Sequence, residues 1–300
     1  MFIADMANRN PSFRSTKLAK ESYSFSFAYD FWVESLFERA MRLFVWSGTG
    51  DIDPHEIESI VLLNGSAGIA KHDGKLAAFF GQYAGKPTVY YDIYEDYTVY
   101  SPLYSANLKV DDGVALIWNN SCRNSIYPLV HRYAVLLAHL EVSLIGTLIN
   151  GRTGGSVPVA STDAAVQTLH NYRNSLCNGK VVPIQDPAFL TVDFKQVDMN
   201  GSLDVKALME TRTDLLNSFY NDIGVKTNHE KKGNMIEEEV AANDSMLLLN
   251  LNDMLATRQK GCEAVNALFG TNWSVDVAEE LKYLKEDDTY EIQSEGTVQG

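Results

Sequence analysis

The sequence predicts an α+β fold, in which long helices and a separate strand-rich region occupy different parts of the chain. Apolar residues recur at three- and four-residue spacing over 129–149 and over 204–223, as expected of helices with one buried face. At 1.5 Å per residue, each of these helices would be roughly 30 Å long. Between 67 and 118 the pattern changes to β-branched and aromatic runs, which predicts a small sheet. A chain of 300 residues is long enough for one or two domains.

The first 21 residues are polar and include several basic side chains. We interpret them as a flexible tail, because polar chain termini are often poorly ordered. The alternative is a basic arm that contacts nucleic acid, with Arg14, Lys17 and Lys20 as its candidate residues.

Two helices are predicted before the strand-rich region. The segment Ser24–Val45 carries an apolar stripe at helical spacing. The next helix starts at Asp53, whose side chain can cap it, with Pro54 at the first helical position and Glu56 completing a capping box. This short helix ends at the Asn-Gly dipeptide 64–65.

The strand-rich region contains one clear turn and two strand-like runs. Asp73-Gly74 is a dipeptide typical of a tight hairpin. The runs Val89–Tyr94 and Val114–Trp118 are rich in β-branched and aromatic residues. We therefore expect a small sheet-containing domain inserted between helices.

The segment that joins the two long helices has a β-α-β pattern. Val157–Ala160 and Val181–Ile184 are extended runs, and Ala164–Leu176 between them has a helical pattern with Thr162 as a candidate cap. The chain should therefore form a small mixed structure between the long helices.

A polar segment, 225–244, follows the second long helix, which ends at Gly224. This segment shows no sustained apolar periodicity, and a further helix is predicted from Ser245. A loop of this length is uncommon in a compact domain unless it is functional or disordered. On composition alone, a solvated surface loop is the favoured interpretation. A short strand is predicted at Trp273–Val277, and an acidic frayed tail at 286–300.

Neither cysteine usage nor hydropathy indicates secretion or a membrane. The three cysteines are far apart and form no metal-ligand spacing and no disulfide framework, which favours synthesis in a reducing cytosol. The N-terminus has no secretory signal. The most apolar span, 129–149, holds too many ionisable residues for a bilayer-spanning helix. These residues are His131, Arg132, His139 and Glu141.

No arrangement of residues indicates catalysis, a metal site or a cofactor. Glu237–Glu239 are consecutive carboxylates in a polar segment, which is typical of a solvated charge run. His229-Glu230 lacks the second histidine of a zinc-binding helix, and the glycine-rich run 151–155 lacks the Gly-Lys-Ser/Thr ending of a phosphate-binding loop. We therefore predict that the protein is not an enzyme.

Two C-terminal runs, GVKTNHEKKGNMIEEEVAAND and RQKGCEAVNALFGTNWSV, resemble the upper-collar proteins of small short-tailed phages of the Salasmaviridae type. These proteins are also called connectors or portals. The runs FVWSG, SPLY and GVALIWNN occur upstream in the order of that family. The resemblance extends roughly from residue 23 to residue 275 and is most specific in the C-terminal runs.

The resemblance implies a portal-type subunit whose long helices line the channel of a ring of twelve copies. It divides the chain into nine segments. The first four are a flexible basic arm (1–21), N-terminal helices of the wing and stem (22–65), a β-rich wing (66–125) and a stem helix (126–150). The others are a β-α-β clip (151–203), a channel helix (204–224), a channel loop (225–244), a C-terminal helical region on the crown side (245–285) and an acidic flexible tail (286–300).

The same resemblance implies a location and partners. The ring would lie at one vertex of the virion capsid, after assembly in the host cytoplasm. Double-stranded DNA would enter through it during packaging and leave through it during ejection. The implied protein partners are the major capsid protein, the lower collar or tail protein and a separate packaging ATPase, with no membrane contact. The sequence leaves open whether a packaging RNA takes part.

The implied DNA-contacting residues are basic. Lys231 and Lys232 correspond to the paired channel lysines of the family, and we group His229 and Lys226 with them. Lys195 and Lys206 match lower channel lysines, although the spacing around Asn200-Gly201 differs by one residue. By type rather than by motif, Arg14, Lys17 and Lys20 match the family's basic N-terminal arm, which touches nucleic acid or the packaging motor.

The net charge of −14 argues against a protein that grips DNA by neutralising phosphates. It is compatible with a conduit through which DNA slides, because an acidic wall repels phosphates over only about 8 Å at physiological salt. The charge is equally compatible with the alternative function, a cellular ring-forming scaffold or pore without a role in DNA transport.

Overall fold

The computed structural model describes residues 25–87, 94–152, 156–160, 162–177, 187, 192–196, 204–226, 237–279 and 281. The chain divides into two units. Unit 1 comprises Met1–Trp32 and Val135–Leu215, and unit 2 comprises Val33–Ala134 and Leu216–Gly300. Unit 2 is therefore built from two chain segments that are separated in sequence by most of unit 1.

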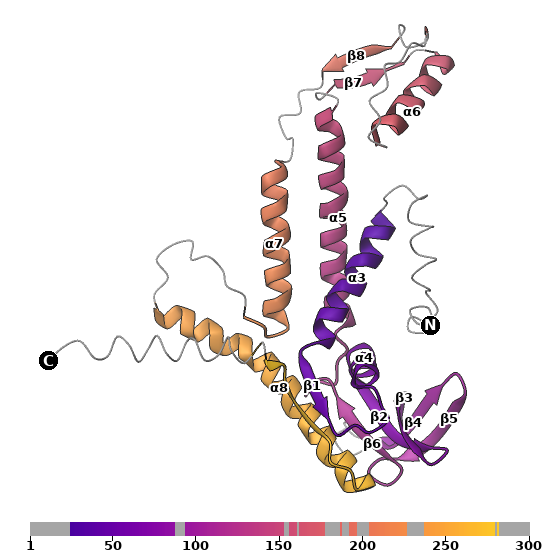
Figure 1. Cartoon of the computed structure of the whole chain (residues 1–300), viewed down its shortest axis with the longest axis vertical. Coiled ribbons are helices and arrows are strands. Elements are labelled where there is room, and N and C mark those ends of the chain that lie inside the picture. Colours follow the sequence, from indigo (N-terminus) through magenta and orange to yellow (C-terminus); the bar gives the residue numbers. More distant parts are fainter. Residues whose placement is uncertain are drawn as a thin grey trace, which may run out of the picture. The chain divides into compact units, whose positions relative to one another are not determined.

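Unit 2 contains a five-stranded antiparallel sheet with the strand order β5-β4-β3-β2-β6 (Figure 1). Its strands are β2 (Ser66–His72), β3 (Lys75–Pro87), β4 (Tyr94–Ser101), β5 (Tyr104–Lys109) and β6 (Val114–Trp118). The predicted hairpin at Asp73-Gly74 is confirmed, because both residues adopt positive φ angles, 49° and 78°, between β2 and β3. The predicted strand at Val114–Trp118 is also confirmed, whereas most of the run Val89–Tyr94 lies outside the described residues.

The helix α4 (Pro54–Asn64) packs against β2 and β3. It begins as predicted, since the His55 N–H donates to Asp53 Oδ1 at 3.0 Å and Pro54 occupies the first turn. It ends at Gly65, which adopts a left-handed φ of 82°. On the sheet itself, Phe79 and Tyr97 belong to a buried apolar cluster.

The segment after α3 (Phe25–Met41) corrects the predicted helix Ser24–Val45. The helix ends at Met41, and Phe44–Ser47 forms a strand, β1, that pairs antiparallel with β9 (Ser274–Val277). Phe44 and Trp46 are buried while Val45 is exposed, so the apolar residues follow the two-residue period of a strand. The strand predicted at Trp273–Val277 is confirmed as β9.

The helix α8 (Glu237–Phe269) packs against β6 and β9 in unit 2. Its residue Arg258 is fully buried and forms a bidentate ion pair with Glu58 of α4, with N–O distances of 2.8 and 2.9 Å. Arg258 also donates to the backbone oxygen of Asn119 at 2.8 Å, and the Trp46 indole donates to Glu58 at 2.9 Å. The Phe44 ring lies 4.2 Å from the guanidinium. This network connects α4, α8, β1 and the end of β6.

Two further residues of the run RQKGCEAVNALFGTNWSV hold α8 in place. A Cβ atom at Gly261 would lie only 2.8 Å from Ile117 Cγ1, so the absence of a side chain allows α8 to approach β6 closely. Asn266 donates to the backbone oxygen of Trp273 at 2.9 Å and accepts from its backbone nitrogen at 2.6 Å. Residues in this run therefore build the core of unit 2.

Between residues 127 and 222, the described part of the chain forms three helices and a two-stranded sheet. These are α5 (Tyr127–Arg152), α6 (Asp163–Cys177), α7 (Val205–Asp222), β7 (Ser156–Val159) and β8 (Asp193–Gln196). The three helices were predicted, and Thr162 accepts from the Ala165 N–H at 3.3 Å as the expected cap of α6. The second strand was expected at Val181–Ile184, which lies outside the described residues, and the strand that pairs with β7 is β8.

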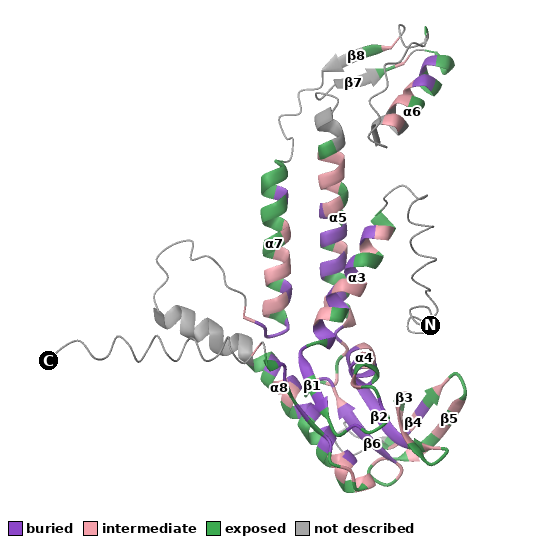
Figure 2. Ribbon diagram, viewed as in Figure 1, coloured by how far each residue is buried: buried purple, intermediate pink, exposed green. Residues whose placement is uncertain are grey.

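Large apolar side chains are exposed on the unit 1 portions of α5 and α7, where Figure 2 shows exposed and intermediate residues alongside the buried ones. These residues are Leu136, Val142, Leu148, Val205 and Met209. Within the described residues, Tyr127–Leu148 is the one helix long and apolar enough to cross a membrane by length and composition, with a mean hydropathy of 1.3. One third of the residues in its most apolar 18-residue window are buried, and Leu136, Val142 and Leu148 are exposed in the single chain.

Candidate functional site

The candidate basic residues are distributed between described and undescribed parts of the chain. Lys195, Lys206 and Lys226 are described, whereas the other candidates lie outside the described residues. Those others are His229, Lys231, Lys232, Arg14, Lys17 and Lys20.

The three described lysines occupy three different elements. Lys195 lies on β8 opposite Val157 of β7. Lys206 is exposed in the first turn of α7, with its Nζ 3.9 Å from Glu210 Oε1. Lys226 is half-buried and follows α7 in unit 2. Because the first two belong to unit 1 and the third to unit 2, the single chain does not define one common basic surface.

The end of α7 leads directly into the lysine-bearing segment and has a defined geometry. Gly224 adopts a left-handed φ of 83°, which confirms the predicted helix end. The Val225 N–H donates to the Tyr220 carbonyl at 2.8 Å, and Ile223 and Val225 are buried. This combination fixes the point at which the chain leaves α7.

Side chains of three other helices contact the last turn of α7. The Tyr133 hydroxyl of α5 donates to Asp222 Oδ2 at 2.8 Å, and Asn250 of α8 donates to the Asp222 backbone oxygen at 3.0 Å. Arg39 of α3 donates to the Tyr220 hydroxyl at 3.0 Å. Burial, together with the negative Asp222 carboxylate that accepts its hydrogen bond, raises the pKa of Tyr133 to about 12. Tyr133 is therefore neutral, and donates this hydrogen bond, throughout the physiological pH range.

The helix α8 begins at Glu237, eight residues before the predicted start at Ser245. The polar segment predicted as a loop over 225–244 is accordingly shorter. Glu237, Glu238 and Glu239 are the first three residues of α8. The carboxylate run that we interpreted as a feature of a loop is therefore a helix start.

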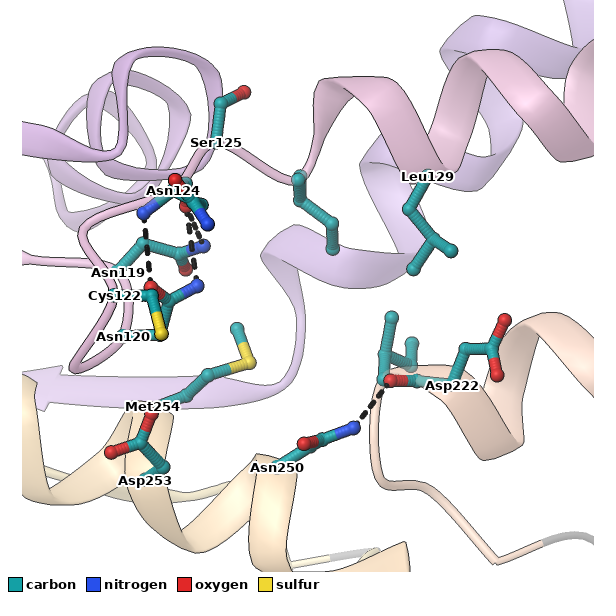
Figure 3. Close-up of a pocket in the computed structure, with 12 residues that line it drawn as sticks. Asn119, Asn120, Cys122, Asn124, Ser125, Leu129, Asp222, Asn250, Asp253 and Met254 are labelled. Atoms are coloured by element: carbon teal, nitrogen blue, oxygen red, sulfur yellow. Dashed lines mark hydrogen bonds between the residues drawn. The ribbon is translucent and has the colours of Figure 1, made fainter.

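A hollow of about 290 Å³ lies in unit 2 between the end of α7, α8 and the chain after β6 (Figure 3). Ile126, Leu129, Ile223 and Met254 contribute apolar side chains to its wall. Several of its polar residues already bind one another, as Asn250 binds Asp222 and as Asn119 and Asn120 both bind the Asn124 backbone oxygen. The described residues contain no cluster of three metal-ligating side chains. The hollow thus lacks the convergent free polar groups of an active site.

Sequence reasoning did not single out Asp222, Tyr133 or Asn250. One signal was available, since Asp222 lies in the last turn of α7, where the helix dipole disfavours a negative charge. A carboxylate in such a position is expected to have a specific partner. The sequence could not identify that partner, because Tyr133 lies 89 residues away.

The family model described as Phage Connector (GP10) matches residues 15–282. Among solved structures, a chain in the portal and tail of native bacteriophage P68 is similar with a TM-score of 0.42 and 14% identity, covering 95% of this chain and 98% of that one. A chain in the virion of a native gene transfer agent particle is similar with a TM-score of 0.41 and 11% identity, covering 91% and 87%.

Proposed function

This chain belongs to the phage connector family, and from that membership we propose that twelve copies form the DNA channel at one vertex of a short-tailed phage capsid. The family is structural and not enzymatic, and its members are portal or connector components of virions. The membership favours this function over a cellular ring-forming scaffold. The Salasmaviridae type, the dodecamer and the passage of DNA during packaging, retention and ejection are the finer parts of our proposal.

The exposed apolar residues of α5 and α7 are the observation that supports a ring. Leu136, Val142 and Met209 are 43%, 38% and 43% exposed in the single chain, although burial of such side chains is favourable by about 1.5–3 kcal/mol each. A ring in which every subunit contacts the next through the same pair of surfaces would cover them. The wing, clip, stem and crown assignments of the nine segments follow from the same proposal.

We expect the purified protein to form a closed ring of roughly 400 kDa, as twelve subunits of 33.4 kDa require. Light scattering coupled to size-exclusion chromatography measures this mass. The double variant Leu136→Asp/Met209→Asp should shift the protein to smaller species, because it places charges in the contact. Leu103→Asp is the matched control, since Leu103 is 95% exposed in the β4–β5 turn, outside the stem helices. A stable wild-type monomer at micromolar concentration would contradict the ring.

The paired lysines are proposed to act on DNA that is already in the channel. Lys231 and Lys232 provide two positive charges per subunit, which a ring repeats as a band of phosphate contacts. Each contact is weak and screened by salt, which permits sliding, while many contacts together resist backward movement of packaged DNA. Lys226, His229, Lys206 and Lys195 are proposed to extend this basic surface along the channel.

The variant Lys231→Ala/Lys232→Ala should assemble rings and start packaging but lose packaged genomes, with the yield of filled heads falling about tenfold relative to ring yield. The control Lys86→Ala/Lys109→Ala removes the same charge from the sheet of unit 2 and should leave filled heads unchanged. Rings that fall apart, or unchanged genome retention, would show that the lysine pair does not have this role.

The proposed partners are those that a portal vertex requires. They are the major capsid protein, the lower collar or tail protein and a packaging ATPase that supplies the energy, with a packaging RNA left open. Arg14, Lys17 and Lys20 are proposed to contact the packaging motor or its nucleic acid, because basic arms bind such partners electrostatically. Assembly is proposed to occur in the host cytoplasm.

A further inference from the structure

The second half of α5 contains three residues that weaken a helix. The Ser143 hydroxyl donates to the His139 backbone oxygen at 2.8 Å, and the Thr147 hydroxyl donates to the Ser143 backbone oxygen at 2.9 Å. In an α-helix such an oxygen also accepts the N–H group four residues later, and this sharing of the acceptor often bends the helix. Gly146 lies between them and costs about 1 kcal/mol of helix stability relative to alanine. We call Ser143–Thr147 the α5 bend segment.

The side chains that pack α5 within the single chain lie before the α5 bend segment. Leu137, Ala138 and Leu140 are buried, whereas the described residues 141–148 are all exposed or half-buried. A Cβ atom added at Gly146 would meet no described atom within 4 Å beyond its own stretch of helix. A bend in this segment therefore uncovers little buried apolar area of the subunit.

The unit 1 part of α7 shows the same chemistry. The Thr211 hydroxyl donates to the Ala207 backbone oxygen at 2.8 Å, and the Thr213 hydroxyl donates to the Met209 backbone oxygen at 3.2 Å. Both threonines are exposed, and their branched side chains lose rotational freedom in a helix. We call Ala207–Thr213 the α7 bend segment.

The two bend segments occupy matching positions along their helices. The rings of Tyr133 in α5 and Phe219 in α7 are in contact, with their centroids 5.6 Å apart. Ser143 follows Tyr133 by ten residues, and Met209 precedes Phe219 by ten residues. Because an α-helix has a constant rise per residue, both segments are reached after the same number of turns from this contact. The two helices can therefore bend together.

We infer that α5 and α7 bend at these two segments, so that the parts of the helices beyond them can move while the packing around Leu137 and Leu140 is kept. This conformational device does not depend on the proposed function. One consequence does rest on it. In the proposed ring Val142 contacts the next subunit, so a bend in one subunit would displace its neighbour as DNA passes.

Hydrogen–deuterium exchange of the purified, assembled protein tests the bend. The variant Ser143→Ala/Gly146→Ala/Thr147→Ala removes the two shared acceptors and the glycine. We expect amide exchange over residues 143–148 to slow by about tenfold, with little change over the packed residues 134–140. Unchanged exchange over 143–148 overturns the inference. Equal slowing over both stretches also overturns it, because α5 would then open as one unit.

Thr257→Ala in α8 is the matched control. The Thr257 hydroxyl also donates to a backbone oxygen four residues earlier, that of Asp253, at 3.0 Å, but Thr257 is buried. Because packing already holds α8 there, its exchange should not slow. Slowing in this control would show that loss of such a hydroxyl has the same effect in any helix, which overturns a special role for the α5 bend segment.

Packaging by the stiffened α5 variant tests the consequence for DNA passage. It should form rings in normal yield but give several-fold fewer filled heads. Adding Thr211→Ala/Thr213→Ala should cause little further loss, because effects on one shared element are non-additive. Normal filled heads overturn this consequence. If the wild-type protein forms no ring, the proposed function fails, while the exchange result still decides whether the helices bend.

Discussion

Replacement of Arg258 by methionine is expected to lower the free energy of unfolding of unit 2 by about 3–5 kcal/mol, because it leaves the Glu58 carboxylate buried without its charged partner. Glu58 is 1% exposed, and the Trp46 indole would be its remaining side-chain donor in the described network. The Asn119 backbone oxygen would also lose its donor. Urea unfolding followed by tryptophan fluorescence measures the change, since Trp46, Trp118 and Trp273 lie in unit 2.

Two variants separate the lost ion pair from lost packing. Lys260→Ala removes an exposed positive charge from the same helix and should change stability by less than about 0.5 kcal/mol. Glu58→Gln combined with Arg258→Met removes both charges and still allows Trp46 to donate, so it should recover part of the loss. An Arg258→Met variant as stable as Lys260→Ala would show that the buried ion pair contributes little.

Gly261→Ala is expected to destabilise unit 2 by about 1–3 kcal/mol, although alanine is normally the better helix former. A Cβ atom at this position would lie 2.8 Å from Ile117 Cγ1 and 3.0 Å from Ile117 Cα. The second atom belongs to the backbone of β6, so a change of side-chain rotamer cannot relieve the overlap. The same urea titration measures the effect.

Gly146→Ala is the matched control for Gly261→Ala. Gly146 also lies inside a helix, α5, and an added Cβ would have no described atom within 4 Å. Its substitution should stabilise the isolated subunit by up to about 1 kcal/mol through helix propensity alone. If both substitutions stabilise the protein, α8 does not approach β6 as closely as the structure shows.

Local patterns predicted the elements whose signals lie within a few residues. The capping group of α4 at Asp53, the turn at Asp73-Gly74 and the helix end at Gly224 were all predicted correctly. Each depends on chemistry between neighbouring residues, namely a side-chain cap or a left-handed backbone angle. The helical spacing of apolar residues likewise predicted the helices α5 and α7.

Long-range pairing explains the errors in the predicted fold. Leu43 and Phe44 continue the apolar spacing of α3, so the helix was extended to Val45, whereas β1 exists because it pairs with β9 about 230 residues later. The sheet partner overrides the local helical pattern. The start of α8 was placed too late because Glu237–Glu239 have no apolar period, although they suit a helix N-terminus.

The site was predicted only in part, for a related reason. The basic candidates follow from a resemblance between sequences, and Lys231 and Lys232 remain predictions because they lie outside the described residues.

The buried Glu58–Arg258 ion pair could have been suspected from one feature of the sequence, a charged residue within the apolar stripe of α8. The stripe consists of Leu251, Met254, Arg258, Cys262 and Val265, all of them buried. An arginine in such a stripe indicates a buried acidic partner, but its identity requires the fold.

Unit 2 is formed by two segments that are separated in sequence, and this arrangement determines the order in which its parts can fold as the chain is synthesised. Glu58 and Arg258 are 200 residues apart, so at ribosomal rates of 5–20 residues per second about 10–40 s pass between their synthesis. The part of unit 1 that lies between the two segments, Val135–Leu215, is synthesised entirely within that interval. Until α8 and β9 emerge, β1 has no pairing strand and β6 lacks the helix that covers it. A translation pause before Arg258 therefore prolongs the exposure of unpaired strands, the kind of surface that chaperones bind and that aggregates when they do not.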